Sequence, residues 1–101
     1  MNDQKLASLL GLAQKAGKIA SGELSVEKAV KSGKARLIII ASDSSDGTKK
    51  KYRDMSQYYQ VPLHEVLTKQ QLGSCIGKEY RAALTIVDKG FSNAISKALM
   101  Q

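Results

Sequence analysis

The most informative part of the sequence for the fold is Arg36-Leu37-Ile38-Ile39-Ile40-Ala41. It places four large aliphatic residues in succession, with no polar residue between them. A strand that has one face in water alternates apolar and polar residues, whereas a strand covered on both faces does not. The stretch therefore predicts a central strand with helices above and below it.

Three further strands are expected around this one. Ala82 to Val87 is apolar along almost its whole length, and Val61 to Val66 is a second clear strand. Pro62, near the start of the latter, favours an edge strand or a strand beginning, because proline cannot donate a hydrogen bond to a sheet. Lys18-Ile19-Ala20 adds a short extended stretch.

The segments between these strands carry apolar residues at helical spacing, with capping residues at their ends. Thr68 and Gln71 have the spacing of a capping box. Gly73 is expected to interrupt the helix that follows. The third helix is expected to turn Thr48, Tyr52, Met55 and Tyr59 inward. Five helices result: Asp3 to Ala16, Ser21-Gly22 to Ser32, one after Gly47, one from Thr68 to Gly77, and one after Asp88.

Helices and strands thus alternate along the chain, which predicts an α/β fold. The nearly all-apolar strands favour a three-layer α/β/α sandwich around a small mixed sheet of about four strands. With 43% hydrophobic and 25% charged residues, the 101 residues resemble an ordinary globular protein. We expect residues 1–101 to form a single domain.

The sequence also indicates where the protein acts. Cys75 is the single cysteine and has no partner for an internal disulfide, and the first four residues lack the features of a signal peptide. The apolar runs are far shorter than the roughly 20 residues that span a bilayer. A monomeric, cytoplasmic protein without a membrane segment is expected.

The charge is strongly basic and unevenly distributed. Sixteen Lys and Arg against nine Asp and Glu give a net charge of +7. Residues 14–36 contribute +4 and residues 47–53 another +4, so the remainder sums to −1. A localised excess of this kind predicts a polyanionic partner. The run Lys49-Lys50-Lys51 has two interpretations, a solvated surface or part of the binding patch.

The helix that begins near Gly22 has the sharper geometry. Leu24, Lys28 and Lys31 fall on one stripe, opposite the apolar stripe of Val26, Ala29 and Val30. One interpretation is a solvated face with a single exposed apolar residue. The other is a nucleic-acid contact, in which the lysines bind phosphates and the leucine meets a base or sugar.

No catalytic constellation is evident. His64 is the single histidine and falls in an expected strand, and one Cys with one His gives no zinc site. The segment Gly73 to Lys78 is one residue too short between its glycines for a phosphate loop and lacks Ser or Thr after the lysine. We expect a protein that is not an enzyme and that holds neither cofactor nor metal.

Three ordered pieces of the sequence together resemble a known family. They run from Ser21 to Val30, from Lys34 to Asp43, and from Thr68 to Gly73. As a set they are similar to the ribosomal L-seven-Ae and L-thirty-e family of kink-turn RNA-binding proteins, and the whole chain resembles its bacterial YlxQ-type branch. The resemblance implies an α/β/α sandwich, in agreement with the strand and helix patterns.

The resemblance also implies where RNA would bind. One element of the site matches Gly22 to Lys28, where the family pattern is Gly-x-Asn-Glu-x-x-Lys. Leu24 and Ser25 stand in place of the Asn and Glu that recognise bases at the kink. The second element matches the loop from Gly77 to Ala83, which is more basic here than in the family. The candidate RNA-binding residues are Gly22, Glu23, Leu24, Ser25, Lys28, Lys31, Arg36, Lys78, Glu79, Tyr80 and Arg81.

Two functions follow as hypotheses. The first is a non-catalytic RNA-binding protein of ribosomal-protein type, which binds structured, kink-turn-like RNA of ribosomal or other non-coding origin and is associated with the ribosome. The alternative is a protein-interaction adaptor that uses exposed Leu24 and Tyr58. Binding dominated by phosphate contacts weakens steeply with salt, whereas an apolar protein contact does not.

Overall fold

A computed structural model describes residues 3–100 of the chain. Over these residues the elements are five helices and four short strands, which alternate after the first helix as expected. In chain order they are α1 (Asp3–Lys15), β1 (Ile19–Ser21), α2 (Glu23–Lys31), β2 (Leu37–Ile40), α3 (Asp46–Tyr59), β3 (Leu63–Glu65), α4 (Lys69–Cys75), β4 (Ala83–Ile86) and α5 (Lys89–Leu99).

The strands form one mixed sheet in the order β1-β4-β2-β3. β4 runs antiparallel to both β1 and β2, while β2 and β3 are parallel. β3 is therefore an edge strand, as Pro62 predicted, and the carbonyl of Pro62 accepts a hydrogen bond from the Ile38 amide. The expected α/β sandwich with a mixed four-stranded sheet is confirmed.

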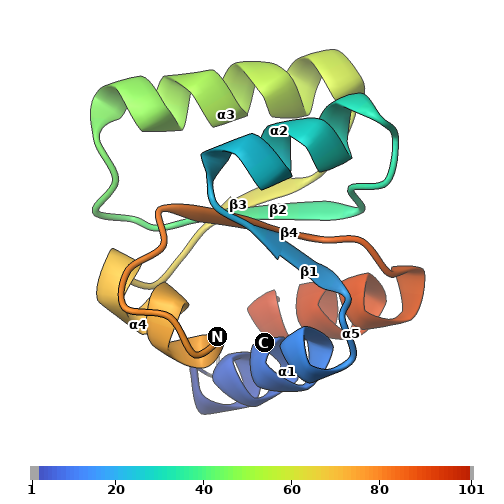
Figure 1. Cartoon of the computed structure of the whole chain (residues 1–101), viewed down its shortest axis with the longest axis vertical. Helices are drawn as coiled ribbons and strands as arrows, with labels where there is room; N and C mark the ends of the chain where they lie inside the picture. Colours follow the sequence, from blue (N-terminus) through green and yellow to red (C-terminus); the bar gives the residue numbers. More distant parts are fainter. Residues whose placement is uncertain (1–2, 101) are drawn as a thin grey trace.

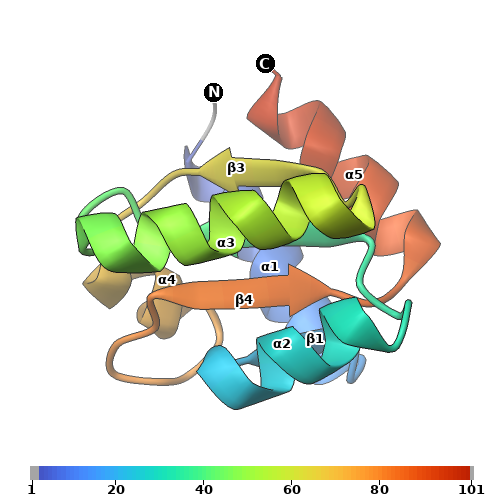
Figure 2. The ribbon, with the colours of Figure 1, turned by 90° about the horizontal axis from the view of Figure 1, so that it is seen from above.

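Helices cover both faces of this sheet. α2 and α3 lie on one face, and α1, α4 and α5 lie on the other (Figures 1 and 2). Successive residues of β2 alternate between the two cores: Leu37 and Ile39 pack with α1, α4 and α5, whereas Ile38 and Ile40 pack with α2 and α3. All four side chains are fully buried, which is why this strand has no polar position.

Local hydrogen bonds explain where several helices begin. Ser45 caps α3 by accepting from the Thr48 amide, and Asp88 caps α5 by accepting from the Phe91 amide. Thr68 and Gln71 form both halves of the expected capping box. The starts of α4 and α5 agree with the sequence prediction, because each depends on residues within one turn, whereas α3 begins at Asp46 and not after Gly47 as expected.

The expectation that Gly73 interrupts a helix is wrong. Gly73 lies inside α4, is buried, and has backbone from the next loop packed against it. A Cβ atom built at this position would lie 2.8 Å from the carbonyl carbon and oxygen of Glu79. The glycine is needed for close approach of that loop and does not break the helix.

The expected inner face of α3 needs a correction at its end. Tyr52 and Met55 are buried as predicted, but Tyr59 is 40% exposed and lies against the exposed ring of Tyr58. Tyr59 is the last residue of this helix, which ends at Gln60 in a left-handed conformation. The phenol oxygen of Tyr52 has no hydrogen-bond partner among the described residues.

Candidate nucleic-acid interface

The start of α2 is the first part of the candidate interface. Strand β1 ends at Ser21, which pairs with Leu84 of β4, and the chain turns directly into the helix at Gly22. Gly22 has φ of 89°, a conformation that favours glycine. Among residues 3–100 no side chain caps α2, so its first amide groups remain available to a ligand at the end where the helix dipole favours negative charge.

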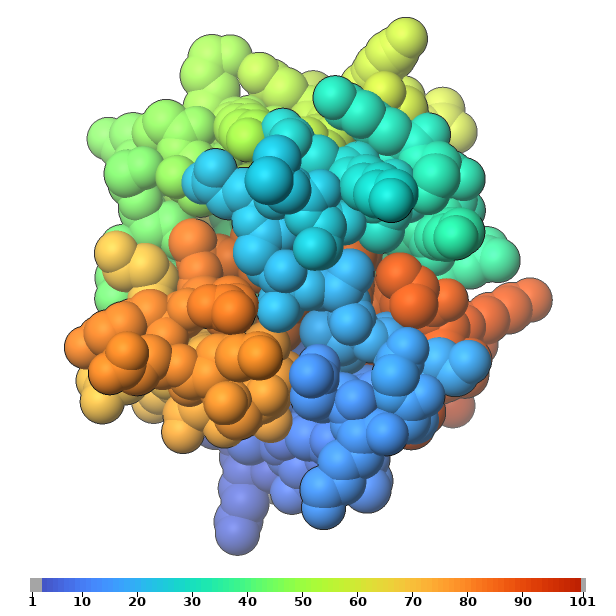
Figure 3. Space-filling view, viewed as in Figure 1, coloured from blue at the N-terminus to red at the C-terminus, as the bar shows by residue number. Residues whose placement is uncertain are grey.

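The loop before β4 is the second part, and the fold places it beside the first. The Gly22 amide donates to the Ala83 carbonyl at 3.3 Å, and the Arg81 guanidinium donates to the Ser21 hydroxyl at 3.3 Å. Figure 3 shows the two segments in contact on one face of the molecule, residues 77–82 in orange and residues 20–25 in blue. Residues about 60 positions apart in the sequence therefore form one surface.

The side chains on this surface are a mixture of apolar, aromatic and basic groups. Leu24 is 83% exposed and Tyr80 is 59% exposed. Ser25, Lys28 and Lys78 are exposed as well. Large exposed apolar groups beside cations are typical of surfaces that bind a nucleic acid, where they contact bases and phosphates respectively.

Arg81 has a structural role within the loop. Besides its bond to Ser21, its guanidinium donates to the carbonyl of Tyr80 at 2.8 Å, and its amide donates to the carbonyl of Lys69. The side chain is half-buried. Arg81 thereby fixes the loop against β1 and leaves Tyr80 as the exposed group of the pair.

Both acidic residues of α2, the candidate Glu23 and Glu27, lie near a lysine of α3. Lys51 of α3 lies 2.8 Å from the Glu27 carboxylate and 3.9 Å from that of Glu23. The hydrogen bond from Lys51 lowers the pKa of Glu27, with a smaller contribution from the charge of Lys31. Because both carboxylates are held by α3, the exposed face of α2 carries mainly the positive charge of its lysines.

Of the two interpretations of Lys49-Lys50-Lys51, a solvated surface or part of the binding patch, the ion pairs of these residues argue against the second. Each ammonium group is paired within the chain: Lys49 with Glu65, Lys50 with Asp54, and Lys51 with the two glutamates of α2. Arg53 also pairs with Glu65. These contacts join α3 to α2 and to β3, so the local excess in the sequence is largely neutralised in space.

The structure does not bring all candidate residues together. Arg36 directly precedes β2, where its amide donates to the Ile86 carbonyl, while Gly22 lies at the opposite end of that strand near Ala83. Lys31 is in the last turn of α2, between these two ends. The two segments Gly22–Lys28 and Lys78–Arg81 form the compact part of the site.

The adaptor hypothesis relied on Leu24 and Tyr58. Leu24 lies in the first turn of α2, whereas Tyr58 lies in the last turn of α3, and the two helices run in the same direction (Figures 1 and 2). The two exposed residues are therefore at opposite ends of this layer and do not form one patch.

A groove beside α2 was not anticipated from the sequence. It has a volume of about 290 Å³ and is lined by Ala20, Ser25, Lys28, Ala29, Ser32, Lys34 and Val87. Its polar residues come from α2 and the connection that follows, while β1 and the end of β4 supply apolar ones. Helical spacing places Ser25, Lys28 and Ser32 on one face of α2. Val87 is distant from them in the sequence and reaches the groove only through the tertiary structure.

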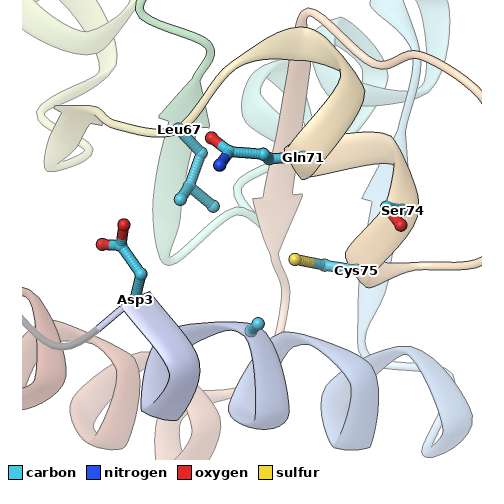
Figure 4. A pocket seen from close by; sticks show the side chains of 6 residues that line it. Asp3, Leu67, Gln71, Ser74 and Cys75 are labelled. Carbon is cyan, nitrogen blue, oxygen red and sulfur yellow. The ribbon is translucent and has the colours of Figure 1, made fainter.

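A second hollow, of about 320 Å³, lies between α1 and α4 on the other side of the sheet. Figure 4 shows Asp3, Leu67, Gln71, Ser74 and Cys75 around it. Burial raises the pKa of the Cys75 thiol, which disfavours the reactive thiolate.

Within residues 3–100, no group of three or more His, Cys, Asp or Glu side chains is arranged to hold a metal ion. No helix over the same residues is long and apolar enough to cross a membrane.

Comparisons with known proteins address the family directly. The family model described as "Ribosomal protein L7Ae/L30e/S12e/Gadd45 family" matches residues 4–96. The RNA-binding protein YlxQ of Bacillus subtilis is 38% identical over 98% of this chain and 99% of its own length. The Enterococcus faecium protein of the same name is 41% identical over 90% of this chain and 87% of its own length. The large ribosomal subunit protein eL30 of Neurospora crassa is 32% identical over 92% of this chain and 87% of its own length.

Solved structures give the same fold. A protein of unknown function from Bacillus halodurans superposes with a TM-score of 0.92 at 40% identity, covering 96% of this chain and 98% of that one. The 15.5 kD RNA-binding protein of Giardia lamblia superposes with a TM-score of 0.79 at 22% identity, covering 96% and 83%. The latter likeness concerns the fold alone.

Proposed function

Because the chain belongs to the ribosomal protein L7Ae/L30e/S12e/Gadd45 family, we propose that it is a non-catalytic protein that binds structured RNA of the kink-turn type. The curated relatives from Bacillus subtilis and Enterococcus faecium carry the name RNA-binding protein. That name supports RNA as the partner of this chain.

One observation of the structure carries the proposal. The start of α2 and the loop before β4 lie side by side, joined by the Gly22–Ala83 and Arg81–Ser21 hydrogen bonds. Their contact makes one continuous surface that a single RNA element can meet.

The chemistry of this surface suits RNA. Lys28 and Lys78 are positioned to attract phosphates, and the uncapped amides of α2 are further donors for an anionic oxygen. Leu24 and Tyr80 offer apolar and aromatic area to unstacked bases or sugars. The carboxylates of Glu23 and Glu27 are held by Lys51 and so oppose the approach of phosphate less.

We also propose that the RNA belongs to the ribosome or to another non-coding ribonucleoprotein. Support comes from relatives named as ribosomal proteins, such as eL30 of Neurospora crassa. In this proposal residues 1–101 act as one domain and as a cytoplasmic monomer. Sedimentation of the free protein would measure the oligomeric state, and crosslinking in cells followed by sequencing would identify the RNA.

The proposal is tested by removing charge from α2. Lys28→Ala combined with Lys31→Ala is expected to weaken binding of a kink-turn RNA, because both side chains lie on the exposed face of the helix. Each phosphate contact that is removed lowers the slope of log affinity against log salt by about one. Titrations at two salt concentrations measure both quantities.

Lys97→Ala is the control, because Lys97 is an exposed lysine of α5 on the other face of the sheet. It should leave affinity and salt slope nearly unchanged. The double variant should unfold at nearly the same temperature as the parent, since both lysines are exposed. Parental affinity and slope in a folded double variant would contradict the assignment of α2 to RNA.

A further inference from the structure

The groove beside α2 opens directly next to the proposed RNA surface. Ser25 and Lys28 belong to both, while Ser32 and Lys34 extend the groove toward the far end of the helix. Its volume of about 290 Å³ is near the lower limit of ligand pockets, which run from about 300 to 1,000 Å³. A space of this size accepts one small planar group and not an extended cofactor.

The floor and the rim of the groove differ in chemistry. Ala20, Ala29 and Val87 supply small apolar surfaces, against which a planar ring can lie. Lys28 and Lys34 stand at the rim, and both are exposed. Ser25 adds a hydroxyl, and the hydroxyl of Ser32 donates to the Ala29 carbonyl at 3.2 Å, leaving its oxygen as an acceptor.

The neighbouring carboxylates do not neutralise this rim. Glu27 and Glu23 are held by Lys51 on the α3 side of the helix. Asp88, the residue after Val87, has a carboxylate oxygen that accepts from the Phe91 amide as the cap of α5. In the described part of the chain no ion pair involves Lys28 or Lys34. An apolar floor with an uncompensated cationic rim matches a base or ribose together with its phosphate.

We propose that this groove holds an unpaired nucleotide that flanks the structured RNA, with its base or ribose on the apolar floor and its phosphate between Lys28 and Lys34. This inference rests on the proposed function, because the nucleotide belongs to the same RNA. It assigns a direction to the bound strand, which leaves the Gly22 end of α2 and follows the helix toward Lys34. In Figure 3 the exposed side of α2 lies above β1, beside the orange-red segment that follows β4.

The test compares two RNAs. One is a kink-turn RNA with blunt ends, and the other carries a short single-stranded uridine tract at one end, placed at the 5′ and 3′ sides in separate molecules. One of the two extended RNAs should bind the parent protein about threefold to tenfold more tightly than the blunt RNA at low salt. Lys34→Ala should remove this gain and leave the affinity for the blunt RNA unchanged.

Matched variants separate the groove from general charge. Lys97→Ala removes one exposed lysine from the other face and should preserve the gain. Ser32→Phe should fill the groove without changing the net charge, and it too should remove the gain. Ser32 is the exposed residue that ends α2, and thermal unfolding checks that this variant is folded.

Several results would overturn the inference. Equal affinity of the parent for blunt and extended RNA would show that the groove takes no flanking nucleotide. Equal losses for both RNAs in Lys34→Ala would show a general phosphate contact instead. A free nucleotide offers the same base, ribose and phosphate as a nucleotide of the RNA, so the protein is also titrated with AMP alone. Binding of AMP in the groove at micromolar concentration would assign the groove to a free nucleotide. If the parent bound neither RNA, the proposed function itself would fail.

Discussion

In the proposed RNA site, Leu24 and Ser25 limit the contacts that the start of α2 can make with bases. Leucine offers no hydrogen-bonding group to a base edge, and serine offers one short hydroxyl. The neighbouring Lys28 still attracts phosphate. Contacts to phosphates position a protein on a nucleic acid, whereas contacts to base edges distinguish sequences. Compared with a site that carries the family's Asn and Glu, we therefore expect this site to keep much of its affinity for RNA but to lose more of its preference for a kink-turn.

The first prediction restores the family pattern. Leu24→Asn with Ser25→Glu should widen the preference for a kink-turn RNA over the same RNA with its sheared pairs replaced. The expected gain is about 1–3 kcal/mol, on the scale known for direct readout of bases. Leu24 and Ser25 are exposed, so the unfolding temperature should change little. Affinities of parent and variant for both RNAs measure the effect. A parent that already distinguishes the two RNAs by several hundred-fold would place specificity elsewhere, in the loop that contains Tyr80.

A second prediction concerns the phenol of Tyr52. Its oxygen is buried with no hydrogen-bond partner in the described part of the chain, and an unsatisfied buried group costs about 1–3 kcal/mol. Tyr52→Phe should therefore raise the free energy of unfolding, by about 1 kcal/mol. Phenylalanine also keeps the ring that lies 5.7 Å from the Lys51 ammonium. Denaturant unfolding of the two proteins measures the difference.

The same residue gives a pH dependence with a definite sign. Burial raises the pKa of Tyr52 from its ordinary value of 10.0 to about 12. The unfolded chain therefore releases this proton first as the pH rises, and the parent loses stability from about pH 10 to about pH 12. Tyr52→Phe has no such proton, so its advantage over the parent should grow across this range. An advantage that is independent of pH would show that the phenol is not buried.

At the scale of elements, α4 supports the second half of the interface. The amides of Lys78 and Arg81 donate to carbonyls of α4, at Gly73 and Lys69 respectively. Because Gly73 has no side chain, the backbone at Glu79 can lie directly on the helix. The position of Tyr80 and Arg81 thus depends on a residue outside the loop.

The third prediction uses this contact. Gly73→Ala should destabilise the protein by about 1–3 kcal/mol, the usual cost of overpacking, and should weaken RNA binding because the loop is displaced from Gly22. Gly47→Ala is the matched control, since a Cβ atom there meets nothing within 4 Å. It should be neutral or slightly stabilising, as alanine favours the helix. Equal stability and affinity of the two variants would contradict the proposed support of the loop.

Elements whose causes are local could be predicted from the sequence. The apolar run of β2, the cap at Asp88 and the capping box at Thr68 each depend on neighbouring residues, and each is confirmed. Gly73 was misinterpreted because its role is set by Glu79 across a tertiary contact. Two strands are shorter than their apolar patterns: β3 covers only Leu63–Glu65 of the expected Val61 to Val66, and β4 covers Ala83–Ile86 of the expected Ala82 to Val87.

In the whole molecule, folding changes how the charges that sum to +7 are distributed over the surface. The basic segment 47–53 contributes +4 in the sequence, yet its four cations pair with carboxylates of α2, α3 and β3. The Lys50–Asp54 pair follows from helical spacing, but the pairs with Glu27 and Glu65 join segments far apart in the chain and could not be predicted. The pairing leaves the exposed face of α2 basic, while the loop with Lys78 joins it at the Gly22 end.

The candidate site was predictable in its parts and not in its arrangement. The stripe of Leu24 and Lys28 follows from helical spacing, and the resemblance to a family indicated the loop around Tyr80. The hydrogen bond from Arg81 to Ser21 and the groove that ends at Lys34 required the tertiary structure. Both depend on the antiparallel pairing of β1 with β4.

In the proposed function, the start of α2 and the loop before β4 form one RNA-binding surface. The most direct measurement is a titration of the isotope-labelled protein with a kink-turn RNA, followed by backbone amide chemical shifts. The largest changes should occur together at residues 22–28 and 77–83, while α5 and β3 remain nearly unperturbed. Changes confined to one of the two segments, or centred on α5, would contradict the claim.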